Sequence, residues 1–105
     1  MDLTYHYIAN LAAEVDIPKN GILSRTIYTD EQIKVSIFGF DKGQELSKHT
    51  ASTAAVVQIL QGEATLTLGG DVREVSSGAW ARMTPGLEHA VFAKTPLVML
   101  LTLFQ

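Results

Sequence analysis

Apolar and polar residues alternate with a period of two along the middle of this chain. Over residues 33–37 the apolar positions are the odd ones, and over 63–68 they are the even ones. Successive side chains of a strand point to opposite faces, so both segments are predicted to be strands with one buried face. Gly69-Gly70 follows the second segment and accepts the positive φ of a tight turn, after which residues 72–75 run back. The sequence therefore predicts a hairpin that turns at residues 69–70.

The rest of the chain has the same organisation. Short apolar or β-branched segments occupy residues 56–60, 79–84, 89–93 and 97–104, and glycine- or proline-bearing turns separate them. Eight or nine short strands with a turn signal every 8–12 residues are typical of a β-sandwich or barrel. No amphipathic segment of helix length lies between the strands, which excludes a parallel α/β sheet. We predict one all-β domain over residues 1–105, with a barrel core at about 22–104.

The N-terminal segment has a different period. Ile8, Leu11, Ala12 and Val15 are spaced by three and four residues, which predicts one short helix, and Pro18 follows it as a breaker. Residues 1–21 are therefore expected to form a helix or arm that precedes the barrel.

Charge and composition exclude several classes of partner. The net charge is −3, with 8 Lys and Arg against 11 Asp and Glu, so no basic face for nucleic acid is expected. The most apolar run, residues 96–104, is about half as long as a membrane-spanning helix, so no membrane partner is expected. The chain has no cysteine and no secretory signal pattern, and we expect a cytoplasmic protein.

Two histidines lie beside glycine-bearing turns at the edges of predicted strands. One segment runs from Gly43 to His49, with Gly62 further along, and the other runs from Gly78 through 84–86 to His89. These segments resemble the two motifs of the cupin family. The first motif is a glycine, five residues, His-x-His, a glutamate and a closing glycine; the second leads from a glycine through a proline and a glycine to a histidine. The resemblance covers about residues 33–103 and implies a small single-domain, RmlC-like cupin with a jelly-roll-like β-barrel.

The resemblance also implies a metal site, which this chain carries only in part. A typical cupin holds Fe, Mn, Zn, Ni or Cu with three histidines and one glutamate. Only His49 and His89 stand at matching positions, while Ala51 and Ala55 stand where the second histidine and the glutamate would be. Metal sites with open positions generally need three protein ligands, so two imidazoles predict weak or absent binding of Zn, Ni, Fe or Mn.

Two other side chains could complete such a site. His6 would have to fold over the barrel, and Gln58 would have to share a strand face with Ala55. Alternation counts against Gln58, because the odd-numbered positions share the face of Ala55 unless a bulge intervenes.

Further residues are candidates for the lining of a pocket, with ordinary core packing as the alternative: Phe38, Trp80, Met83 and Gln58. Arg82 could anchor a carboxylate if it faced inward, although an outer position with a wet head group is the stronger expectation. The resemblance places His49 and His89 on adjoining strands, facing one cavity. Ala51 and Ala55 would leave space there for water, an anion or a small organic molecule.

Two classes of function follow. The first is a binding module that holds a small molecule, or weakly a divalent metal, in the barrel pocket. The alternative is a metal-dependent enzyme of the dioxygenase or isomerase type, as the resemblance implies, so enzymatic activity stays open. A homodimer is expected, with the C-terminal strand at 97–104 and the tyrosines of the N-terminal arm as its interface.

Overall fold

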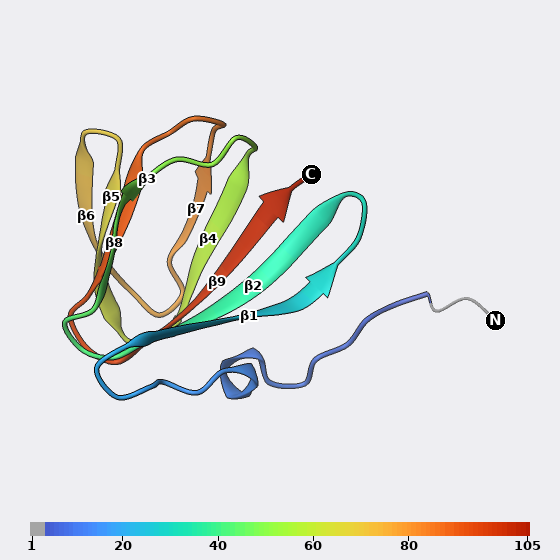
Figure 1. The fold of residues 1–105 in the computed structure, drawn as a ribbon, viewed down its shortest axis with the longest axis horizontal. Helices are drawn as coiled ribbons and strands as arrows, with labels where there is room; N and C mark the ends of the chain where they lie inside the picture. Colours follow the sequence, from blue (N-terminus) through green and yellow to red (C-terminus); the bar gives the residue numbers. More distant parts are fainter. Residues whose placement is uncertain (1–3) are drawn as a thin grey trace.

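The computed structural model describes residues 4–105. Its regular secondary structure consists almost entirely of strands, which confirms the all-β prediction (Figure 1). One short 3-10 helix precedes them, η1 (Leu11–Glu14). The strands are β1 (Ile22–Thr29), β2 (Ile33–Phe40), β3 (Glu45–His49), β4 (Ala55–Gln61), β5 (Glu63–Leu68), β6 (Asp71–Ser76), β7 (Trp80–Met83), β8 (His89–Ala93) and β9 (Leu97–Phe104).

The strands form two antiparallel sheets that face each other (Figure 1). One has the order β1-β2-β9-β4-β7 and the other the order β3-β8-β5-β6, so the chain passes repeatedly from one sheet to the other. The predicted hairpin is present, since Leu68 pairs with Asp71 and Gly69 has a φ of 60°. The predicted barrel is thus a pair of packed sheets with β6 and β7 at two of their edges.

The main core lies between the sheets and follows the alternation of the sequence. Every second residue of β4 contributes to it, namely Ala55, Val57 and Ile59, and β5 contributes Ala64 and Leu66. The odd positions of β4 therefore face inward, as alternation predicts.

A second apolar cluster covers the outer face of the five-stranded sheet. Val15 of the N-terminal arm packs there with Ile37, Val98 and Leu100. The arm passes so close to β2 that a β-carbon on Gly39 would lie 2.5 Å from the carbonyl oxygen of Asp16. Glycine at this position is what allows the arm to lie against the sheet.

The helix predicted over residues 8–15 is much shorter than expected. Only Leu11–Glu14 is helical, and both flanking residues are extended, with φ values of −147° at Asn10 and −142° at Val15. The spacing of the apolar residues reflects contact of an irregular arm with the sheet rather than one face of a regular helix. Residues 1–3 of the predicted arm lie outside the described residues.

The apolar C-terminal strand occupies the middle of its sheet, between β2 and β4. Leu97 and Met99 face the main core, while Val98 and Leu100 belong to the cluster under the arm. Burial on both faces within one chain explains why this strand is so apolar, and it leaves Phe104 at its end exposed. In residues 4–105 no helix has the length and apolar character needed to cross a membrane.

Candidate functional site

The two motif histidines lie directly beside each other. His49 is the last residue of β3 and His89 is the first of β8, and the two residues are partners in the register of these antiparallel strands. Their ring centroids are 4.1 Å apart and the ring planes meet at 60°. The structure thus brings together two side chains that are 40 residues apart in the sequence, as the sequence analysis expected.

Each ring is oriented by its own hydrogen bond to the backbone carbonyl oxygen two residues earlier. The Nδ1 atom of His49 lies 2.7 Å from the carbonyl oxygen of Ser47, and that of His89 lies 3.0 Å from the carbonyl oxygen of Leu87. A carbonyl oxygen only accepts hydrogen bonds, so each Nδ1 carries the proton and donates it. In the neutral imidazoles, both Nε2 atoms are left as lone-pair acceptors.

Two cavities adjoin this pair. A small inner cavity of about 40 Å³ is lined by both histidines and by apolar side chains, among them Phe38 and Met83. An outer cavity of about 340 Å³ is lined by the same histidines, by residues 50–53 and by Ala55, Leu101 and Leu103. His89 is 6% exposed, whereas His49 is exposed to solvent. We refer to the histidine pair and the outer cavity as the mouth site.

No protein-family model and no curated protein matches this sequence. Solved structures do match. A conserved protein of unknown function from Streptococcus pyogenes is 31% identical, with a TM-score of 0.85 over 98% of this chain and 90% of that one. A cupin 2 conserved barrel domain protein from Leptotrichia buccalis is 32% identical, with a TM-score of 0.84 over 91% of this chain, which spans 47% of that protein. A cupin superfamily protein from Desulfitobacterium hafniense is 22% identical, with a TM-score of 0.86 over 99% of this chain and 95% of that one.

The chain has the cupin fold. The two-sheet fold agrees with the structural neighbours that carry the name, and the histidines that suggested it lie together in space.

The residues that line the mouth site do not fit a tightly held metal ion. Within residues 4–105, no group of three or more His, Cys, Asp or Glu side chains is placed to hold one. Ala51 and Ala55 both line the outer cavity, where their methyl groups offer no donor atom. His6 lies elsewhere, with its ring 5.2 Å from that of Tyr28 on β1.

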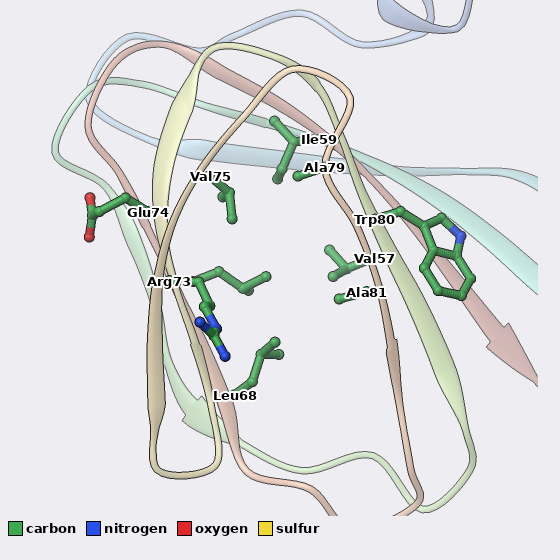
Figure 2. Close-up of a pocket in the computed structure, with 10 residues that line it drawn as sticks. Val57, Ile59, Leu68, Arg73, Glu74, Val75, Ala79, Trp80 and Ala81 are labelled. Atoms are coloured by element: carbon green, nitrogen blue, oxygen red, sulfur yellow. The ribbon is translucent and has the colours of Figure 1, made fainter.

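Two other residues proposed for the pocket are not brought to the histidines. Gln58 pairs with Trp80 across β4 and β7, on strand positions that alternate with the inward-facing Val57 and Ala81. Trp80 is 61% exposed and borders a different cavity, from which its indole projects away (Figure 2). Neither residue therefore lies at the mouth site, because of the alternation that had already counted against Gln58. Arg82 is exposed and pairs with Val56, as its expected outer position requires.

Sequence reasoning missed part of the mouth site. Leu101 and Leu103 line the outer cavity, as do Thr50, Ser52 and Thr53. The leucines could have been found from register, because Leu103 pairs with Ala55 and Leu101 with Val57. The loop at 50–53 has no comparable periodic signal.

Proposed function

We propose that this cupin binds a small organic molecule at the mouth site and holds a divalent metal there only weakly. The observation that carries the proposal is the pair of adjacent imidazoles whose Nδ1 atoms are both engaged by backbone carbonyls. Their Nε2 atoms are free to meet a ligand in a cavity of about 340 Å³. Ligand pockets of this kind combine an apolar lining with a few polar groups that fix orientation.

The tautomer of the two histidines, with the proton on Nδ1, indicates which hydrogen-bonding groups a ligand needs. Two neutral imidazoles with protonated Nδ1 atoms present two adjacent acceptors and no donor at Nε2. The complementary ligand donates two hydrogen bonds from neighbouring atoms, as a vicinal diol does. Leu101 and Leu103 on the wall of the cavity would contact an apolar body attached to those hydroxyl groups.

Metal binding at the same pair is the competing possibility. Histidines that ligate metals usually donate their second ring N–H to a carbonyl or carboxylate, and His49 and His89 do so. Two nitrogen ligands offer little to offset the dehydration of a dication, so we expect affinities for Zn²⁺ and Ni²⁺ weaker than micromolar. Because protons compete for the same nitrogens, such binding would weaken further on acidification.

The first test uses catechol, a vicinal diol on an apolar ring, titrated into metal-free protein and followed by amide NMR shifts. Saturable shifts are expected around residues 49–53 and 89. They should be lost in His49→Ala and His89→Ala and kept in His6→Ala, which removes the remaining histidine on another face. Veratrole, in which both hydroxyl groups are methylated, should not bind. If catechol does not bind, or binds equally well to His49→Ala and the native chain, this ligand chemistry is wrong.

The second test measures Zn²⁺ and Ni²⁺ binding by isothermal titration to the native chain and the same variants. Weak binding is expected. Submicromolar binding that is lost in both histidine variants would replace the proposal with a metal-dependent protein, the class that includes the dioxygenase and isomerase alternative.

A further inference from the structure

A second cavity lies between the sheets, away from the histidines (Figure 2). Its volume is about 300 Å³. It is bordered by β6, the edge strand of one sheet, and by β7, the edge strand of the other, with β4 and β5 behind them. We call it the edge cavity. Neither histidine lines it, although Val57 and Leu66 line both the edge cavity and the small inner cavity.

Small side chains at the start of β7, and directly before it, leave this space open. The residues that face inward before Met83 are Ala79 and Ala81, and across the cavity from them lie Val75 and Leu68 (Figure 2). The methyl groups of the two alanines are too short to contact Val75 and Leu68. Side chains therefore fill the centre of the core but not the space between the edge strands β6 and β7.

Two charged residues border this otherwise apolar space, Arg73 and Glu74. Alternation along β6 directs Arg73 to the same side as Val75, while the carboxylate of Glu74 projects the other way (Figure 2). Glu74 is already engaged on that outer face, where Nζ of Lys94 lies 2.9 Å from its Oε1 and the hydroxyl of Thr65 donates to it.

Among the residues that the structure describes, Arg73 forms no such ion pair. The ion pairs formed within residues 4–105 are Arg25–Glu14 and Lys94–Glu74, and neither involves Arg73. Asp71 is the nearest acidic residue on the same strand face by alternation, at the turn end of β6. The guanidinium is thus available to an anion beside an apolar cavity, and its planar donors match both oxygens of a carboxylate.

We propose that the edge cavity is a second ligand site, specific for a small organic monocarboxylate. The carboxylate pairs with Arg73, and the apolar body lies among Val57, Leu68, Val75, Ala79 and Ala81. This site is independent of the mouth site, and its ligand differs in charge from the neutral diol proposed there.

The test uses benzoate as the probe and the full chain followed by amide NMR. Saturable shifts are expected at residues 73–75 and 79–81. Benzamide, its neutral analogue, should bind the native chain about tenfold more weakly, since it cannot form the charge-assisted pair. Arg73→Gln should weaken benzoate binding by about tenfold, so that benzoate and benzamide bind the variant with similar affinity.

Three further variants distinguish the effect of charge from that of cavity volume, and the edge cavity from the mouth site. Asp71→Asn removes the acidic neighbour on the same strand face and should leave benzoate binding unchanged or tighter. Ala81→Leu fills the cavity and should block benzoate and benzamide alike, with the amide spectrum as the check on folding. His49→Ala should leave benzoate binding unchanged, whatever becomes of catechol binding.

Three outcomes would overturn the edge site. They are equal benzoate affinity in the native chain and Arg73→Gln, shifts confined to residues 49–53 and 89 that His49→Ala removes, and no saturable shifts up to about 10 mM benzoate.

Discussion

The carbonyl oxygens of Ser47 and Leu87 determine what the histidine pair can do. Each accepts a hydrogen bond from the Nδ1 of the histidine two residues later, so the ring orientation is set by local backbone. The Nε2 atoms then remain as acceptors in rings whose centroids are only 4.1 Å apart. A single neutral histidine offers one acceptor, whereas this pair presents two as a unit.

This geometry predicts the tautomer of each ring. At about pH 8.5, where a typical imidazole is neutral, His49 and His89 should both carry the proton on Nδ1 and show an unprotonated Nε2. A long-range ¹H–¹⁵N correlation spectrum distinguishes the two nitrogens directly. His6, which is exposed, serves as the reference within the same sample. A protonated Nε2 on either motif histidine would contradict the hydrogen bonds on which the proposed function rests.

At the scale of elements, the turns between strands differ in how much they depend on glycine. Gly62, between β4 and β5, has a φ of 93°, and a β-carbon there would overlap the carbonyl oxygen of Pro96. Gly78, before β7, has a similar φ of 99° but has no atom within 4 Å of the position of a β-carbon. The glycine that closes the first motif is therefore required by its backbone conformation and by the close approach of the β8–β9 connection.

Substitution at these two glycines should separate the two effects. Gly78→Ala carries the cost of an unfavourable φ alone, about 1–3 kcal/mol of unfolding free energy. Gly62→Ala carries that cost and the overlap with Pro96, so it should lower the unfolding free energy further. Denaturant unfolding of both variants measures the difference, and equal losses would show that the contact with Pro96 relaxes freely.

The turn between β1 and β2 is held by Asp30. Its carboxylate accepts hydrogen bonds from the backbone N–H groups of Ile33 and Gln32 and from the hydroxyl of Tyr28. These bonds, the one from Ile33 above all, lower the pKa of Asp30 below its usual value of 3.8. The fold therefore favours the ionised carboxylate.

Acidification should remove the stabilisation that the ionised Asp30 carboxylate provides. A lowered pKa in the folded state stabilises the fold above the usual pKa of 3.8, and the gain is lost as the pH falls through the lower folded value. Asp30→Asn should therefore be less stable than the native chain at neutral pH, and the difference should narrow below about pH 3.8. Thermal unfolding across this range measures it. Glu31→Gln, which removes a carboxylate from the same turn, is the control, and a difference that stays constant with pH would refute the assignment.

At the scale of the whole molecule, the N-terminal arm covers one face of a sheet without closing over it. Val15 seals the apolar cluster on the outer face, but a cavity of about 680 Å³ remains between residues 4–11 and strands β1 and β2. Tyr5 and Tyr7 are 79% and 76% exposed beside it. Large aromatic side chains left in water next to an open apolar cavity favour contact with another chain.

We therefore propose a homodimer through the arm rather than through the C-terminal strand, which is buried at the centre of its sheet. Light scattering at micromolar concentrations should give about twice the chain mass of 11.4 kDa. Replacing Tyr5 and Tyr7 together by alanine should return the mass to that of one chain. Phe92→Ala, which removes an exposed aromatic ring from the other sheet, should leave the dimer intact. A native mass of one chain would refute the dimer.

The sequence by itself determined the strands, the hairpin at 69–70 and the inward positions of β4, because alternation and turn residues act over neighbouring positions. The resemblance to the cupin motifs implied that His49 and His89 lie on adjoining strands, and their roles as ligands remain a prediction. Alternation also indicated that Gln58 lies on the opposite strand face from Ala55, and it does.

Tertiary structure decided the features that depend on distant segments. The N-terminal spacing predicted a helix, but the arm packs on β2 and β9 in a largely irregular conformation. Local periodicity carries no information about such contact. Arg73 lies beside a cavity because two edge strands from different sheets meet with only alanines on one wall. No pattern within one strand specifies what stands opposite it, so the edge cavity is visible only once the sheets are packed.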